Sequence, residues 1–233
     1  FLDENDNPVF QPGRIVNWSS TNGGSFSQSS STTNVNGLAD VIYTTSKKAN
    51  IEHLVSATDN NGLTGTSNLI KTKASQPSKL IVTPSDLFPQ AGSEINVKCQ
   101  LVDEFENPVN QFEYVLNWNA TNGGKFQYPN TLLDENGFSK NQLKVSSKAG
   151  DNHIVNVKSV NDQNIFGVSK EIKVIPANGS KYIVNVNIKN PYIGNSVEAE
   201  AQLVDQFNNI VKSEGVNVSW SATNGGNFLN PNT

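Results

Sequence analysis

The feature that most constrains this chain is an internal repeat of about 100 residues. One motif occurs three times, at spacings of 100 and 102 residues: LDENDNPV at 2–9, VDEFENPV at 102–109 and VDQFNNIV at 204–211. Each copy is followed by a second shared block: NWSSTNGGSF at 17–26, NWNATNGGKF at 117–126 and SWSATNGGNF at 219–228. A repeat of this length has the size of one small domain, so the sequence predicts tandem copies of one fold.

Aligning the copies divides the chain into three units, of which only the middle one is complete. We expect a partial domain at 1–75 that lacks its first strands, a complete domain at 76–177, and a partial domain at 178–233 that lacks its last strands. The pattern predicts a longer parent protein with further copies. The connecting segments TKASQPSK (72–79) and VIPANGSK (174–181) are short and contain Pro, so they favour a constant relation between neighbouring units.

The complete unit has the pattern of a β-protein. Apolar and polar residues alternate in short segments, as in Ile95, Val97, Cys99 and Leu101, and Asn-Gly, Gly-Gly or Pro turns separate these segments. Helical periodicity is absent. About seven such strands in 100 residues, with one Trp on the third, predict an all-β fold of tandem immunoglobulin-like β-sandwiches, one complete and two partial.

The order of these motifs resembles a known family. An acidic residue followed by NPV, a strand ending in ATNGG plus an aromatic residue, an NG turn, and a final H-x-V-x-A/V strand are similar to the bacterial immunoglobulin-like domains, group 1. Two features depart from the family pattern: the Gly that commonly precedes NPV is Asp6, Glu106 or Asn208, and Ile210 replaces Pro in the third unit. These departures affect the first hairpin turn.

The resemblance implies a function as well as a fold. Domains of this family build the extracellular stalks of intimin and invasin-like adhesins. The implied role is a structural stalk or spacer at the bacterial cell surface, in an outer-membrane-anchored parent, which presents a distal adhesive tip. The implied partners are neighbouring repeats in the same chain, and a host surface protein or glycan bound through parts beyond these residues.

Six residues that invite a chemical interpretation are predicted to be structural instead. The two histidines are equivalent residues of successive units, too far apart to share a metal ion, and the cysteine is replaced by Ala201 in the next unit. Each Trp shares the inward phase of its strand with an aliphatic residue. The predicted structural core residues are Trp18, Trp118, Trp220, His53, His153 and Cys99.

Acidic residues crowd into the first turn of the first two units, whereas the third copy keeps only one of them, and two interpretations stay open. The side chains could cap the turn by accepting backbone N–H bonds, with no cofactor, or they could bind calcium weakly. No complete calcium loop is present. The residues are Asp3, Glu4 and Asp6, then Asp103, Glu104 and Glu106, and finally Asp205, Gln206 and Asn208.

Composition narrows the function further. The net charge of −4 with scattered Lys disfavours nucleic acid, and no apolar run approaches the length of a membrane span. The TNGG segments lead into strands, so they are not phosphate loops, and we expect no enzymatic activity. Three alternatives to a stalk remain: a loop-mediated binding module for a host protein or glycan, a surface-layer or filament subunit, and an accessory region of an exported enzyme.

Overall fold

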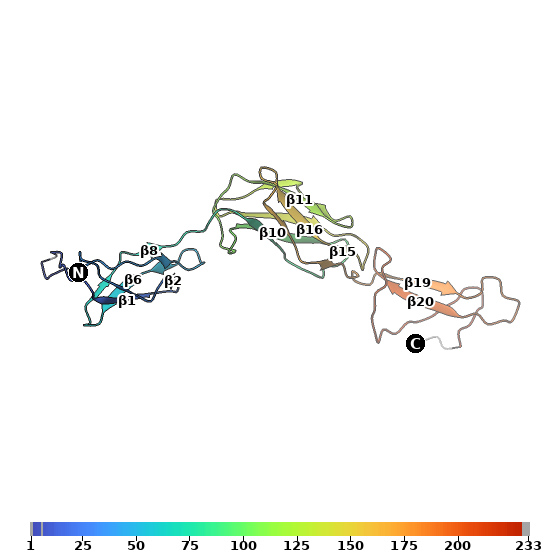
Figure 1. Cartoon of the computed structure of the whole chain (residues 1–233). Coiled ribbons are helices and arrows are strands. Elements are labelled where there is room, and N and C mark those ends of the chain that lie inside the picture. The colour runs from blue at the N-terminus through green and yellow to red at the C-terminus, as the bar shows by residue number, and fades with distance from the viewer. Residues whose placement is uncertain (1, 6, 230–233) are drawn as a thin grey trace.

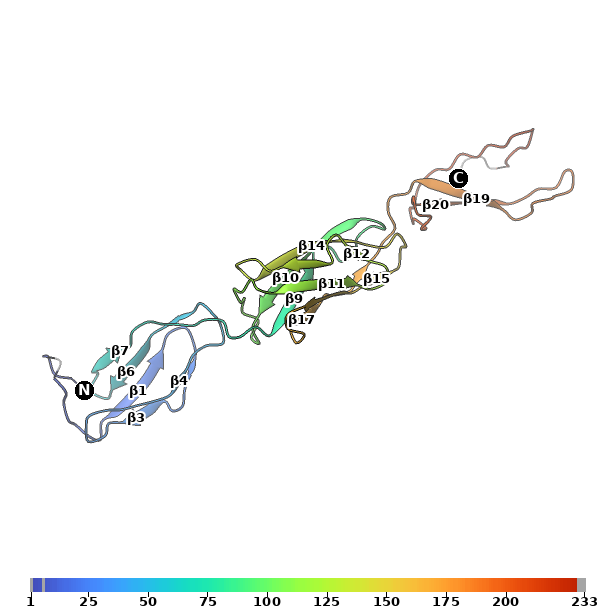
Figure 2. The ribbon, with the colours of Figure 1, turned by 90° about the horizontal axis from the view of Figure 1, so that it is seen from above.

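The computed structural model describes residues 2–5 and 7–229, and these form strands, turns and loops without a helix. The predicted all-β class is confirmed. Three bodies follow one another along an extended path, with the N-terminus in the first and the C-terminus in the third (Figures 1 and 2). Among the described residues, no helix is long and apolar enough to cross a membrane.

The middle body is a sandwich of two four-stranded antiparallel sheets. The sheet orders are β12-β14-β10-β9 and β13-β11-β16-β17, with β15 and β18 as an additional pair. The strands are β9 (Lys79–Pro84), β10 (Glu94–Val102), β11 (Val115–Ala120), β12 (Lys125–Phe126), β13 (Asn130–Leu132), β14 (Phe138–Lys144), β15 (Asn152–His153), β16 (Val155–Ser159), β17 (Phe166–Val168) and β18 (Ile172–Lys173). This arrangement is the predicted immunoglobulin-like sandwich.

The alternating sequence of β10 explains why this sandwich closes. Residues Val97, Cys99 and Leu101 have no exposed surface, whereas the residues between them face solvent or are only partly covered. Trp118, on β11 of the facing sheet, is 5% exposed and belongs to the same core. Burial of this apolar surface is the main stabilising contribution to the unit.

The first body contains the counterparts of β11 to β18 only. Its strands β3-β1-β6-β7 form one sheet, and β2-β4 and β5-β8 form two short pairs. The strands are β1 (Ile15–Ser20), β2 (Ser25–Phe26), β3 (Ser30–Thr32), β4 (Tyr43–Thr44), β5 (Glu52–His53), β6 (Val55–Asp59), β7 (Thr64–Thr66) and β8 (Ile70–Lys71). Trp18 is half-buried here, unlike Trp118, because the described residues of this body include no counterparts of β9 and β10.

The third body contains one hairpin, β19 (Lys181–Val186) and β20 (Ala199–Val204). After β20 the described residues form turns, loops and isolated bridges, so the strand expected around Trp220 is not formed, and this Trp is also half-buried. The predicted domain boundaries at 75/76 and 177/178 stay a prediction, and their outer limits, residues 1 and 233, lie outside the described residues.

Tight turns recur at equivalent places in all three bodies, and in the middle body the turn joins β11 of one sheet to β12 of the other. In each TNGG segment the Asn and the first Gly both have positive φ, for example 53° at Asn122 and 81° at Gly123. Asn and Gly adopt positive φ at lower cost than other residues do. The Asn-Gly pair therefore fixes this turn locally, before any packing contributes.

Candidate functional site at the junctions between repeats

The candidate functional site is the turn that follows β10, where the middle body meets the first. The Asp103 carboxylate is 1% exposed and lies at the centre of this turn. Its Oδ1 accepts backbone N–H bonds from Phe105 and Asn107, both at 2.9 Å. Its Oδ2 accepts the backbone N–H of Ser75, in the connecting segment, at 2.9 Å. One carboxylate thus holds the turn closed and fixes the end of the linker.

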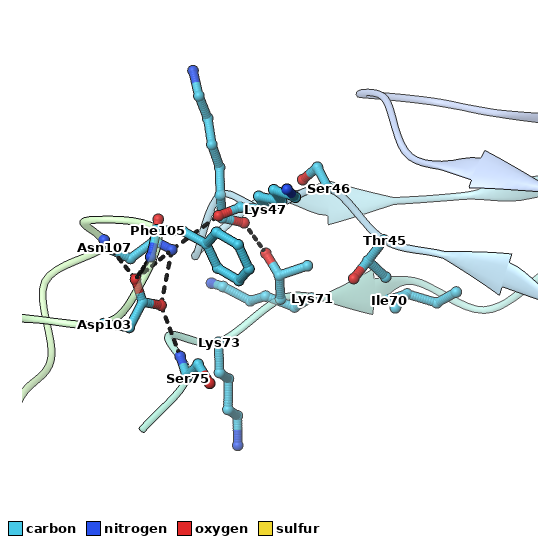
Figure 3. Close-up of a pocket in the computed structure, with 12 residues that line it drawn as sticks. Thr45, Ser46, Lys47, Ile70, Lys71, Lys73, Ser75, Asp103, Phe105 and Asn107 are labelled. Atoms are coloured by element: carbon cyan, nitrogen blue, oxygen red, sulfur yellow. Dashed lines mark hydrogen bonds between the residues drawn. The ribbon is translucent and has the colours of Figure 1, made fainter. Parts of the chain in front are cut away.

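The Asn107 side chain crosses from this turn to the preceding body (Figure 3). Its Nδ2 donates to the Asp103 carboxylate and to the Lys47 carbonyl oxygen, each at 2.9 Å. Its Oδ1 accepts the backbone N–H of Ala49 at 2.9 Å. The amide therefore pairs with the backbone of the neighbouring body as another strand would, and Asp103 sets its orientation.

An aromatic contact accompanies these hydrogen bonds. The ammonium of Lys47 lies 5.0 Å from the centroid of the Phe105 ring, within the range of a cation–π interaction. Both residues line a pocket of about 330 Å³ at the junction, together with Lys71 and Ser75 (Figure 3). The first junction thus combines three kinds of contact: the linker bond, the amide bridge and the cation–π pair.

The second junction repeats the hydrogen bonds of the first. Asn209 Nδ2 donates to the Ser147 carbonyl oxygen at 2.8 Å, and its Oδ1 accepts the Ala149 N–H at 2.9 Å. Asp205 Oδ2 accepts the Ala177 N–H at 2.9 Å. The same roles therefore fall on the equivalent residues of the next unit, so the junction is a property of the repeat.

The aromatic residue of the second junction has a different neighbour. Phe207 packs over Gly92, and a Cβ atom at residue 92 would lie 2.5 Å from the ring. Gly92 also has a φ of 73°, which favours glycine. A further bond joins Gln90 Nε2 to Asn178 Oδ1 at 3.3 Å. Glycine at residue 92 thus lets the ring approach the backbone of the preceding unit.

The turn of the first unit has the same internal structure. Asp3 Oδ1 accepts the backbone N–H groups of Asn5 and Asn7 at 2.9 Å, and Asn7 Nδ2 donates to Asp3 Oδ2 at 3.1 Å. Asp3 is exposed, whereas Asp103 and Asp205 are buried. Asp6, predicted to belong to this acidic turn, lies outside the described residues. The turn is thus formed without a neighbouring unit, and docking buries it.

The electrostatics of the two buried carboxylates follow from these bonds. Burial by itself raises the pKa of Asp103, but the hydrogen bonds from Asn107, Ser75 and Phe105 outweigh burial and lower that pKa below its ordinary value. The pKa of Asp205 is lowered for the same reasons. Both groups are therefore anionic at neutral pH, and folding favours the anion.

The capping bonds of one of the two interpretations left open by the sequence are present: both Asp103 oxygens accept backbone N–H groups. The weak binding of calcium, which is the other interpretation, stays a prediction. Glu106 and Asn208 stand where the family commonly has Gly. Both residues adopt the positive φ that favours Gly, 66° and 67°, so the turn forms without it. Sequence reasoning missed the bridging Asn107 and Asn209, although an Asn recurs there in every copy.

The two histidines share one contact inside their units, to the carbonyl oxygen of the equivalent Thr. His153 is fully buried, its Nε2 accepts the Ser146 N–H at 3.0 Å, and its Nδ1 contacts the Thr121 carbonyl oxygen at 2.6 Å. His53 is also fully buried and contacts the Thr21 carbonyl oxygen at 3.0 Å. Both ring nitrogens of His153 are thus occupied by groups of the protein.

The single cysteine lies in the centre of the middle sandwich. Cys99 has no exposed surface, and burial raises the pKa of its thiol to about 12. A thiol with this pKa is protonated at neutral pH and is a poor nucleophile. Trp118 lies in the same core and donates from Nε1 to the Thr131 hydroxyl at 2.7 Å.

Comparisons with known proteins give matches among solved structures only. No family model matches the sequence, and no curated protein matches it. Among solved structures, the D00-D0 domain of intimin is 14% identical, covers 72% of this chain and 88% of its own, and gives a TM-score of 0.47. Invasin, described as a bacterial integrin-binding protein, is 15% identical over 91% of this chain and 43% of its own, with a TM-score of 0.42. A β-glycosidase from Bacteroides vulgatus is 13% identical over 69% of this chain and 21% of its own, with a TM-score of 0.41.

Intimin and invasin, whose repeats the sequence resembles, are thus among the structures similar to this chain. The matched stretch spans less than half of invasin and about a fifth of the glycosidase. The assignment of the immunoglobulin-like fold rests on the strand orders of the middle body described above.

Proposed function

We propose that this chain is part of the stalk of a bacterial cell-surface adhesin, in which tandem immunoglobulin-like units act as a stiff extracellular spacer. The observation that carries the proposal is the repeated junction: Asp103 with Asn107, and Asp205 with Asn209, make the same bonds to the preceding unit. A spacer needs the same geometry at every joint, because each added unit must extend the distal end by a constant amount. A chain of freely jointed domains would not do this.

Each junction constrains two independent elements. The amide bridge ties the turn to the loop of the preceding body, through Lys47 and Ala49 at the first junction. The carboxylate ties the same turn to the linker, through Ser75. Bending at the linker therefore requires breaking a hydrogen bond of the buried Asp103 carboxylate and two hydrogen bonds of the half-buried Asn107 amide.

The proposal assigns no catalytic step to this chain, and its partners are the neighbouring units. A metal ion is not needed at the joints, because N–H donors already occupy both oxygens of Asp103 and of Asp205. A host protein or glycan belongs, in this proposal, to the distal tip of the parent.

Small-angle scattering on the chain at low concentration, in EDTA and in millimolar calcium, tests this function. A stiff spacer gives one elongated particle whose maximum dimension is the same in both conditions. A broad distribution of dimensions in EDTA would refute the stiff spacer. A distribution that narrows on addition of calcium would refute the metal-independent joint and assign calcium to the acidic turns.

A further inference from the structure

One outer face of the middle sandwich gathers four lysines that are scattered in the sequence. Lys98 on β10 is directly opposite Lys140 on β14, and this is the first pair. Lys125 on β12 is directly opposite Lys144 on β14, and this is the second pair. Residues directly opposite each other, or four apart along one strand, point to the same side of a sheet. All four side chains are exposed, and we name this surface the lysine face.

The positive charge of the lysine face is not balanced by ion pairs. In the described part of the chain, the ion pairs involve Arg14, Lys71 and Lys79, and none of these four lysines. Glu94, opposite Lys144, is the only acidic residue of β10, β12 and β14. Like charges directly opposite each other on neighbouring strands repel, which destabilises the pairing. An anion bound between two such ammonium groups replaces this repulsion by attraction.

The strand pairing itself does not depend on lysine. The residues equivalent to the first pair are acidic in the sister units, Glu200 and Asp40, so both charges are reversed there. The residues equivalent to the second pair are Ser25 and Thr44, which are directly opposite each other in the first body. None of these equivalent residues is lysine. The charge of the lysine face is therefore particular to the middle unit and is not a requirement of the repeat.

A hollow with an aromatic wall adjoins the first pair. Its volume is about 540 Å³, and Lys98, Lys140, Phe138 and Leu132 are among the residues that line it. Phe138 precedes Lys140 by two residues on β14, so it lies on the same face, and it is 46% exposed. Asp134 also lines the hollow, but its Oδ1 accepts the backbone N–H of Phe138 at 2.9 Å. The hollow thus places two ammonium groups beside an apolar surface.

This combination fits an acidic polysaccharide. The C–H groups on one face of a sugar ring pack against an exposed aromatic ring, and sulfate or carboxylate groups accept charge-assisted hydrogen bonds from ammonium groups. Lys140 and Lys144 are four residues apart on β14, so the two pairs lie about 13 Å apart. An acidic polysaccharide carries its charges on separate sugar rings. A nucleic acid strand, with a phosphate about every 3.4 Å, matches this wide spacing poorly.

We propose that the lysine face of the middle unit binds a sulfated or carboxylated polysaccharide along β14. A sugar ring packs on Phe138, one negative group lies between Lys98 and Lys140, and a second negative group farther along reaches the second pair. The contact lies on the side of a unit and not at a distal tip. It therefore adds a lateral attachment to the spacer role, and it does not depend on that role.

Fluorescence anisotropy of labelled oligomers titrated with the 233-residue chain tests the proposal. The probes are a heparin-derived hexasaccharide, which is sulfated, an oligogalacturonate, which is carboxylated, neutral maltohexaose and single-stranded DNA. We expect at least one acidic oligosaccharide to bind, with an affinity that falls as NaCl is added, because salt screens exposed charges. The stronger of the two identifies the preferred anionic group. Binding of neither, or equally tight binding of maltohexaose or DNA, would overturn the proposal.

Charge reversal at the first pair locates the site. Lys98→Glu combined with Lys140→Asp introduces the residues of the sister units and should weaken binding roughly 10- to 100-fold, because two attractions become repulsions. Lys158→Glu combined with Lys170→Glu gives the chain the same net charge. Both of these lysines are exposed, on or next to strands of the facing sheet, so this variant should bind like the wild type. Equal losses in the two double variants would assign the binding to overall charge and overturn the proposal.

The aromatic wall is tested separately from the charges. Phe138→Leu introduces the residue of the first unit, Leu38, and removes the ring without changing the charge. We expect binding to weaken roughly 2- to 10-fold, with the same dependence on salt as the wild type. All of these substitutions change exposed residues, so the unfolding midpoint should stay that of the wild type. An unchanged affinity for Phe138→Leu would overturn the packing of a sugar ring on this residue.

Discussion

Replacing Asn107 by alanine should loosen the first junction without unfolding either unit. The side chain contributes two hydrogen bonds to the preceding body, through Lys47 and Ala49. At about 0.5–1.5 kcal/mol for each bond, the loss amounts to roughly 1–3 kcal/mol. The ratio of docked to undocked junctions should therefore fall by roughly 5- to 150-fold.

Distances between two spin labels, one on each body, measure this change. Labels at Thr32→Cys and Lys158→Cys report on the junction, because both residues are exposed and the buried Cys99 escapes labelling. Asn107→Ala should broaden the distance distribution and leave the unfolding midpoint nearly unchanged. Asn7→Ala is the control, since Asn7 makes the same bond within its turn but none to another body among the described residues. An unchanged width for Asn107→Ala would refute the amide bridge as the element that stiffens the joint.

Three further results are expected. Trp118→Ala should destabilise the middle unit by about 3–5 kcal/mol in urea unfolding, and Trp18→Ala should cost less because Trp18 is only half-buried. The folded-state pKa of Asp103 lies below the ordinary value of 3.8, so the stabilisation that the carboxylate gives to the junction is complete at neutral pH and is lost as the pH falls through the folded-state pKa. The distance distribution between the spin labels should therefore broaden only in strong acid. Asp103→Asn should lack this acid transition. Cys99, with a pKa of about 12 and no exposed surface, should resist a thiol reagent at pH 8 in the native chain and react on unfolding; reaction at the unfolded rate without denaturant would contradict its place in the core.

Much of the candidate site was visible in the sequence, but its key residues were not. The acidic turns and their capping role could be predicted because Asp bonds to N–H groups two and four residues ahead, as Asp103 does. The bridge from Asn107 to Lys47 joins residues 60 apart in the chain, and no local pattern indicates it. The recurrence of Asn at this place was a signal, yet an Asn in a turn is equally well explained by the turn itself.

The sequence by itself determined the repeat, the strands of the middle unit and the turns of this protein. Alternation in β10 follows from the two-residue period of a strand, and the Asn-Gly turns follow from the φ values that these residues tolerate. These are properties of neighbouring residues, so the order of amino acids suffices to specify them.

Only the tertiary structure decided what the ends of each unit do. It joined the Asn107 side chain to the backbone of the preceding unit, through Lys47. It also gave the equivalent Phe105 and Phe207 different neighbours, the Lys47 ammonium at the first junction and Gly92 at the second. The physical reason is that burial and hydrogen bonding between distant segments depend on which strands are present to meet them, and equivalent sequences then acquire different surroundings.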